Sequence, residues 1–233
     1  MSYDLYIGDQ SFSSWSLRGW LLFENFGIPF KQRFVDFDGA GHFDPKTVGQ
    51  QMADLAPART VPTVVTPEGA LVWDSLAIAE ELASRHPDAG IWPSDPFARA
   101  TARTLAAEMH SGYGALRNDC PMNLRCAYTT FEPSEAVQND VKRIETVWNY
   151  ALEKSGGPWL CGDYSAVDVF FAPVAARLAG YGLPVSGLAA DYLKTQLAEP
   201  AFRRWRAMGL VKGPDLPWYA RDYAQTTWPG PEP

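Results

Sequence analysis

The 233-residue chain is poor in cysteine, and this scarcity excludes two kinds of site. Its three cysteines, Cys120, Cys126 and Cys161, show no Cys-x-x-Cys spacing, which argues against a disulfide framework and against a structural zinc site. Isolated cysteines are usually buried and unreactive, so we predict three idle thiols and no metal site.

Histidine is equally scarce. The three histidines are His42, His86 and His110, and none lies in a Gly-x-Ser-x-Gly sequence or in another context typical of a catalytic triad. A serine hydrolase needs a histidine base beside its serine. The sequence therefore does not favour a hydrolase, although serine is concentrated near the N-terminus.

Basic charge and long apolar runs are also lacking. The chain has 20 Lys and Arg against 27 Asp and Glu, whereas a nucleic-acid-binding surface needs a basic balance. No apolar run reaches the length of a membrane span, and residues 1–4 lack the basic-then-apolar pattern of a signal peptide. We therefore expect a soluble, cytoplasmic protein with no nucleic-acid partner and no membrane partner.

The chain does contain a hydrophobic fraction of 46%, which is enough for a packed core in one large domain or two small ones. Its first third has a strand-like run over residues 3–7, an apolar helical pattern over 15–25 and a second strand-like run over 30–37. This order predicts a βαβ unit with two parallel strands. Residues 38–49 are predicted to form a loop with one short helix.

The turn before the first helix is crowded with hydroxyl groups, in the sequence Ser11-Phe12-Ser13-Ser14-Trp15-Ser16-Leu17-Arg18. The unpaired N–H groups at the start of a helix favour an anion. A serine at this place either caps the helix or helps to hold a phosphate, a carboxylate or a thiolate. The turn alone leaves both interpretations open.

Two later features suit a ligand as well. Pro62 interrupts the β-branched run from Thr60 to Val65. A cis bond there would turn the backbone of Val61 outward to a ligand, whereas a trans proline would only open an edge strand. After a strand over 70–73, Asp74 and Ser75 precede a helix, where they can cap it or hold a ligand carboxylate. With the serine-rich turn, these features suit a short peptide with an anionic end.

The rest of the chain predicts a second, helical domain. The proline-rich stretch 87–97 is the predicted linker between residues 1–86 and residues 98–233. The first helix after the linker is expected to continue through Tyr113 and Leu116 despite two glycines.

Two further helices are expected, one over residues 135–154 and one from Ser165. Asp168, three residues after Ser165, completes a capping box at the start of the second of these helices. That helix is hydrophobic on most sides, so we place it at the buried centre of an all-helical domain. Residues 208–233 are predicted to be a tail held by aromatic side chains.

Several of these signals resemble one known family. Ser13-Ser14-x-Ser16-x-Arg18, Val61-Pro62-Thr63 and Asp74-Ser75-Leu76-Ala77-Ile78 are similar to motifs in the thioredoxin-like domain of glutathione transferases, and Gly162–Asp168 resembles the capping box of that family's helical domain. The serine-rich turn is most similar to the zeta class, which includes the maleylacetoacetate isomerases. The resemblance implies a thioredoxin-like α/β domain followed by an all-helical C-terminal domain, and a homodimer.

The resemblance also implies roles for individual residues. Ser13 corresponds to the zeta-class serine that faces the glutathione sulfur, and Ser14 to the serine beside it. Trp15 stands where that class has a cysteine, so cysteine-dependent variants of the family's chemistry are not expected. The other implied glutathione contacts are the backbone of Val61, the cis-proline Pro62, Asp74 and Ser75 at the γ-glutamyl group, and Arg59 and Thr60 near the glycyl end.

A pocket for the second substrate is implied where the helical domain overhangs the thiol. Its candidate residues are Met109, His110, Tyr113 and Arg117, together with Pro121 and Met122. Helix packing is the alternative role for these residues, because methionine and aromatic side chains usually belong to the core. Arg117 and Arg177 are candidates either for holding an anionic substrate or for a structural ion pair.

The implied cofactor is glutathione, and the implied reactive species is its thiolate. A free thiol has a pKa of about 8.5, so ionisation near neutral pH needs help, which a serine O–H and a helix N-terminus both provide. We predict transfer to a small hydrophobic electrophile. A glutathione-dependent cis-trans isomerase and a non-catalytic binding or scaffold protein remain as alternatives. Whether Ser13 or Ser14 contacts the sulfur is left open.

Overall fold

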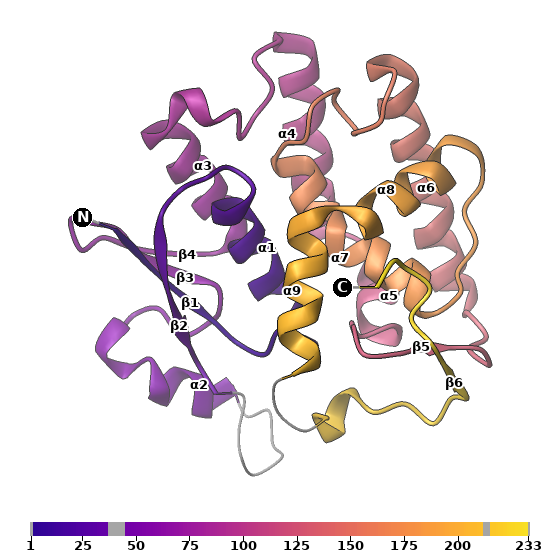
Figure 1. Cartoon of the computed structure of the whole chain (residues 1–233), viewed down its shortest axis with the longest axis horizontal. Coiled ribbons are helices and arrows are strands. Elements are labelled where there is room, and N and C mark those ends of the chain that lie inside the picture. The colour runs from indigo at the N-terminus through magenta and orange to yellow at the C-terminus, as the bar shows by residue number, and fades with distance from the viewer. Residues whose placement is uncertain (1, 37–44, 212–214, 233) are drawn as a thin grey trace.

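The computed structural model describes residues 2–36, 45–211 and 215–232, and it places a small sheet domain beside a larger helical domain (Figure 1). The sheet has the strand order β2-β1-β3-β4, with β1 parallel to β2 and the other pairs antiparallel. The predicted βαβ unit is therefore present. The strands are β1 (Tyr3–Ile7), β2 (Phe30–Phe34), β3 (Thr63–Val65) and β4 (Leu71–Trp73).

Helix α1 (Ser14–Glu24) connects the two parallel strands and packs against the sheet. It is followed by Gly27 with a φ of +64°, a left-handed conformation that glycine adopts without a steric penalty. His42 and most of the predicted loop over residues 38–49 lie outside the described residues. The other helical segments of this domain are α2 (Pro45–Gln51), η1 (Ala53–Leu55), α3 (Ser75–Arg85) and η2 (Pro87–Ala89).

The second domain is helical, as predicted, with one small addition. Two short strands, β5 (Ala127–Tyr128) and β6 (Gln225–Thr226), pair in antiparallel fashion where the C-terminal tail returns over the domain. Strands of two residues have no periodicity that a sequence pattern can reveal. The helical segments are α4 (Pro96–Ser111), α5 (Gly114–Asp119), α6 (Glu135–Ser155), α7 (Ala166–Gly180), α8 (Gly187–Ala198), α9 (Pro200–Leu210) and η3 (Pro217–Tyr219).

Helix α7 lies at the centre of the molecule, as its sequence predicted. It is buried along almost its whole length and packs against α1, α4 and α8. Its capping box is present, because Asp168 accepts a hydrogen bond of 2.9 Å from the backbone N–H of Ser165. One hydrophobic cluster runs from the sheet through α1 into α7, so the two domains share a continuous core (Figure 1).

One predicted helix is broken in two. The helix expected to continue through Tyr113 and Leu116 ends at Ser111, and α5 begins at Gly114. Between them Tyr113 has a φ of +56°, and a Cβ on Gly112 would lie 2.6 Å from the carbonyl oxygen of Glu108. The two glycines lower helix propensity enough for tertiary contacts to favour the break.

Other boundaries differ only slightly from the predictions. Helix α4 begins at Pro96, inside the predicted linker, and β3 begins at Thr63, three residues into the predicted strand. All three cysteines are free, and burial raises the pKa of the Cys120 and Cys161 thiols to about 12. No helix in the described part of the chain is long and apolar enough to cross a membrane.

Candidate functional site

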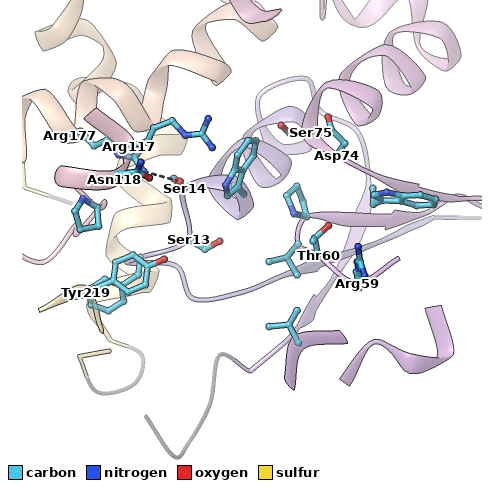
Figure 2. Close-up of a pocket in the computed structure, with 17 residues that line it drawn as sticks. Ser13, Ser14, Arg59, Thr60, Asp74, Ser75, Arg117, Asn118, Arg177 and Tyr219 are labelled. Carbon is cyan, nitrogen blue, oxygen red and sulfur yellow. Dashed lines mark hydrogen bonds between the residues drawn. The ribbon is translucent and has the colours of Figure 1, made fainter. Parts of the chain in front are cut away.

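A cavity of about 540 Å³ lies between the two domains, at the N-terminus of α1 (Figure 2). The sheet domain supplies most of its wall, and α5, α7 and the C-terminal tail supply the remainder. The lining residues are Phe12, Ser13, Ser14, Trp15, Val48, Arg59, Thr60, Val61, Pro62, Trp73, Asp74, Ser75, Arg117, Asn118, Pro121, Arg177 and Tyr219.

The turn between β1 and α1 is held by Asp9. Its Oδ1 accepts hydrogen bonds from the backbone N–H groups of Ser11 at 2.7 Å and Phe12 at 3.0 Å, and its carbonyl oxygen accepts one from Ser13 at 2.9 Å. Ser13 is therefore fixed as the N-cap of α1, and its Oγ accepts the backbone N–H of Ser16 at 3.2 Å. The predicted helix cap is confirmed, and the capping serine also faces the cavity.

A second serine lies behind the first. The Oγ atoms of Ser13 and Ser16 are hydrogen-bonded at 2.8 Å, and Ser16 Oγ accepts the backbone N–H of Gly8 at 2.9 Å. Ser16 is fully buried, and within the described residues its hydroxyl has no other partner. These hydrogen bonds form a chain that runs from Gly8, just after β1, through Ser16 to Ser13 at the cavity.

Ser14 has a different supporting group. Arg177 of α7 donates to Ser14 Oγ at 3.2 Å, the contact drawn as a dashed line in Figure 2. The same guanidinium is held by the carbonyl oxygens of Cys120 at 2.9 Å and Pro173 at 3.2 Å. Burial, and then the nearby positive charge of Arg117, lower the pKa of Arg177 to about 10.

Trp15 is surrounded by cationic side chains. The guanidinium of Arg18 lies 4.6 Å from the centre of its ring and that of Arg117 lies 4.8 Å away, both within the range of cation–π attraction. The ring also contacts His110 edge-on, with the ring centres 5.5 Å apart. Trp15 cannot perform the thiol chemistry of the cysteine that the zeta class has at this position. Its ring instead holds Arg18 and Arg117 in place beside the cavity.

The Val61–Pro62 peptide bond is cis, which agrees with the sequence-based prediction. Both residues line the cavity, and Arg59 and Thr60 lie on the same wall. Helix α1 approaches Pro62 so closely that a Cβ on Gly19 would lie 2.5 Å from the proline Cβ. The absence of a side chain at Gly19 therefore allows the middle of α1 to pack directly against Pro62.

A second helix N-terminus faces the cavity at Asp74 and Ser75. Asp74 is the N-cap of α3, with its side chain accepting the backbone N–H of Leu76 at 2.8 Å. Its other carboxylate oxygen lies 3.0 Å from Nε2 of His110, which ties the sheet domain to α4. The hydroxyl of Ser75 is buried and has no hydrogen-bond partner within the described residues.

The cavity brings together most of the predicted site residues, but not all. Every predicted glutathione contact lines it, and so does Arg117, whereas Met109, His110 and Tyr113 are not among the described lining residues. Met109 is fully buried in the core, and Tyr113 donates a hydrogen bond to Glu108 at 2.8 Å.

Pro121 and Arg177, which the sequence analysis also named as candidates, line the wall as well, whereas some of its other parts were not assigned to the site from the sequence. Asn118 follows Arg117 on α5, and Tyr219 arrives from the C-terminal tail, where its ring packs 5.0 Å from that of Phe12. Ser16 and Arg18 were present in the serine-rich motif, but only the structure gives them partners. Tyr219 belongs to the aromatic tail predicted over residues 208–233, but no motif spacing linked it to Ser13, from which most of the chain separates it.

The fold and the position of the cavity define a class of protein, in which a thioredoxin-like sheet domain precedes a helical domain and a site lies between them. A family model for the N-terminal domain of glutathione S-transferases matches residues 12–85. A probable maleylacetoacetate isomerase from Caenorhabditis elegans is 32% identical over 183 residues, which cover 78% of this chain and 81% of the relative. The chain belongs to the glutathione transferase superfamily.

Two further comparisons agree with this assignment. A maleylacetoacetate isomerase from Dictyostelium discoideum is 27% identical over 169 residues, covering 68% of this chain and 71% of the relative. A crystal structure of a glutathione transferase homologue from Burkholderia gl BGR1, with bound glutathione, has a TM-score of 0.66 at 23% identity, covering 90% of this chain and 98% of that one. This likeness extends the shared fold over both domains.

Proposed function

We propose that the protein binds glutathione in this cavity and stabilises its thiolate for reaction with a small electrophile. The observation that carries this proposal is the Ser13 hydroxyl, which is held at the N-terminus of α1 and faces a cavity also lined by a second helix N-terminus at Asp74 and Ser75. Solved structural relatives in complex with glutathione support the choice of ligand.

In this proposal the tripeptide lies across the cavity from α3 to α1. The N–H groups at the start of α3 and the unpartnered hydroxyl of Ser75 hold the γ-glutamyl carboxylate, and Asp74 holds the amine. The backbone of Val61 pairs with the cysteinyl residue, and Arg59 and Thr60 lie near the glycyl end. The sulfur then lies at Ser13 and Ser14.

The hydrogen-bond chain behind Ser13 favours the thiolate. In the structure Ser13 Oγ donates to Ser16 Oγ. With a thiolate bound, the two hydroxyls rotate so that Ser16 donates to Ser13 Oγ, and the Ser13 proton then points at the sulfur. Each donor in such a chain polarises the next. The positive end of the α1 dipole acts in the same direction. The serine thus donates a hydrogen bond and does not itself attack.

The thiolate has two uses that this site supports. In transfer, sulfur bonds to the electrophilic carbon, and the leaving group departs with the electron pair of its own bond. In isomerisation, sulfur adds to a cis double bond conjugated with a carbonyl, the electron pair moves onto that carbonyl, the new single bond rotates and sulfur is expelled. The names of the two relatives described as maleylacetoacetate isomerases favour the second use as the alternative function.

The proposal is tested by titrating glutathione bound to the protein and following the ultraviolet absorbance of the thiolate. We expect the pKa of the bound thiol to fall at least one unit below its value of about 8.5 in free thiols. Conjugation of 1-chloro-2,4-dinitrobenzene, measured beside isomerisation of maleylacetone, then separates transfer from isomerisation. Binding with an unchanged thiol pKa and neither activity would indicate a non-catalytic glutathione-binding protein, and absence of binding would overturn the proposal.

A further inference from the structure

His110 does not line the cavity, but it contacts a residue that does. Its Nε2 lies 3.0 Å from Oδ2 of Asp74, the N-cap of α3. An ionised carboxylate only accepts hydrogen bonds, so Nε2 carries a proton and is the donor. The contact joins α4 of the helical domain to the cavity wall that the sheet domain supplies at Asp74.

The surroundings of His110 hold its ring in this orientation. The ring packs edge-on against Trp15 of α1 and Phe170 of α7, with the ring centres 5.5 Å and 6.2 Å apart. Arg117 Nη1 donates to the backbone carbonyl of His110 at 3.3 Å. Nδ1 of the ring is buried and has no hydrogen-bond partner among the described residues. Within the described part of the chain, the hydrogen bonding of the imidazole is therefore directed at Asp74.

Asp74 is a residue whose conformation needs such support. Its φ is +86°, in a region that residues other than glycine seldom adopt. A residue stays in such a conformation only where its surroundings fix it. Oδ1 of Asp74 accepts the backbone N–H of Leu76 at 2.8 Å, and Oδ2 accepts from His110. The orientation of this carboxylate therefore depends on its own helix and also on the helical domain.

The carboxylate of Asp74 can still bind a cation. Each of its oxygens can accept two hydrogen bonds, and each accepts one within the described residues. The side chain is 43% exposed and lines the cavity. The two contacts thus fix the carboxylate and leave it able to accept from a donor in the cavity.

We propose that His110 is a positioning residue for glutathione binding, and that it acts through Asp74 on the amino group of the γ-glutamyl residue. The inference rests on the proposed function, because it takes Asp74 to hold that amine. A charge-assisted hydrogen bond is strong only when donor and acceptor are well aligned, and His110 supplies this alignment from the helical domain. This role replaces the place in the second-substrate pocket that the sequence analysis expected for His110.

Two ligands that differ in one group provide the test. Glutaryl-cysteinyl-glycine is glutathione without the γ-glutamyl amine. By calorimetry we expect the wild-type protein to bind glutathione about 10-fold more tightly than this deamino analogue, as a hydrogen bond between charged groups would give. In His110→Phe, which keeps an aromatic ring and removes the donor, the affinity for glutathione should fall about 5-fold, and that for the analogue should change by less than about 2-fold.

A conservative variant and the kinetics separate a positioning role from a structural one. His110→Gln should bind glutathione nearly as tightly as the wild type, because Nε2 of glutamine is a donor as many bonds from Cβ as Nε2 of histidine. In the conjugation assay, His110→Phe should raise KM for glutathione and leave kcat at saturating glutathione unchanged.

The matched control is His86→Phe, at the other end of α3. His86 is the C-cap of this helix, and its Nε2 is hydrogen-bonded to the hydroxyl of Tyr3 at 2.9 Å. The variant therefore removes a comparable contact of a histidine ring with the same helix, away from Asp74. Both affinities should remain at their wild-type values.

Equal losses of affinity for the two ligands in His110→Phe would overturn the inference, and so would a His110→Gln variant that behaves like His110→Phe. If His110→Phe does not fold, NMR of the imidazole nitrogens in the wild-type protein replaces it. Glutathione should shift the Nε2 signal of His110 more than the analogue does, and equal shifts would contradict the proposed role. Equal wild-type affinities for the two ligands would overturn the inference and leave glutathione binding intact. Binding of neither ligand would overturn both proposals.

Discussion

Two helices at the centre of this molecule start from a serine cap, and the two caps are completed by different residues. In α7 the cap is Ser165, and Asp168 three residues later accepts its backbone N–H at 2.9 Å. In α1 the cap is Ser13, and the matching position three residues later is Ser16. The two helices pack against each other.

The residue at the third position accounts for the difference. Asp168 is fully buried and also accepts hydrogen bonds from the Leu160 N–H at 3.2 Å and the Tyr192 hydroxyl at 2.9 Å, which closes the end of α7. Ser16 carries no negative charge, so no acidic side chain in the first turn of α1 neutralises the positive end of its helix dipole. An anion arriving from the cavity can take that place. The two serine caps therefore differ in the charge of the residue that completes them.

Removing the carboxylate that completes the cap of α7 should have the largest effect on stability. Asp168→Ala leaves two backbone N–H groups and the Tyr192 hydroxyl buried without an acceptor, and we expect it to lower the free energy of unfolding by about 4 kcal/mol. Urea denaturation measures this loss. Asp163→Ala, at an exposed position in the same loop, is the matched control and should change the stability little. A loss below about 1 kcal/mol for Asp168→Ala would contradict the structural role.

The same residue gives the protein a distinctive pH dependence. Burial raises the pKa of Asp168 from 3.8 to about 6, so between these values the folded state holds a proton that the unfolded state has lost. The free energy of unfolding should therefore decrease as pH rises through this window, by about 3 kcal/mol in total from this group. Denaturation curves at several pH values should show this slope in the wild type and not in Asp168→Asn. A variant with the wild-type slope would show that other groups cause it.

Removing the serine cap of α1 should reduce catalytic activity more than it reduces stability. Ser13→Ala removes the donor proposed for the sulfur, and we expect kcat/KM to fall about 100-fold, as for the loss of one donor to a developing anion. Stability should fall by about 1 kcal/mol through the lost cap. Ser134→Ala is the control, because Ser134 caps α6 by accepting the Val137 N–H at 3.3 Å, outside the cavity. Ser134→Ala should lower the free energy of unfolding by a similar amount and leave kcat/KM unchanged.

A smaller effect is expected from the serine behind the cap. Ser16→Ala interrupts the chain from Gly8 to Ser13, and the pKa of bound glutathione should rise by about one unit, with a 10-fold loss of kcat/KM at about pH 7. The thiolate absorbance of the bound tripeptide measures the shift. If Ser14→Ala raises this pKa and Ser16→Ala does not, then Ser14 and Arg177 support the thiolate instead.

Much of the candidate site followed from local sequence patterns. The serine-rich turn and the Asp74–Ser75 pair were identified as places where a side chain can cap a helix, and the structure gives the caps as Ser13 and Asp74, which accept N–H groups two or three residues further along the chain. Asp168 was identified in the same way. Pro62 indicated the part of the cavity wall that it forms with Val61, because a proline interrupts a strand pattern. Tyr113 was misplaced, since two weak helix formers left its conformation to contacts with the rest of the protein.

The sequence by itself determined where polar side chains cap helices, because a cap and the N–H group that it accepts are close neighbours in the chain. It also determined the main strands of the sheet, because alternating apolar residues identify a strand. Only the tertiary structure decided that Arg18, Arg117 and Arg177 gather around Trp15 and Ser14. They come from three separate helices, and no spacing in the chain encodes their meeting. Packing of α1 against α7 brings Arg18 and Arg177 together, and Arg117 joins them from α5 at the ring of Trp15.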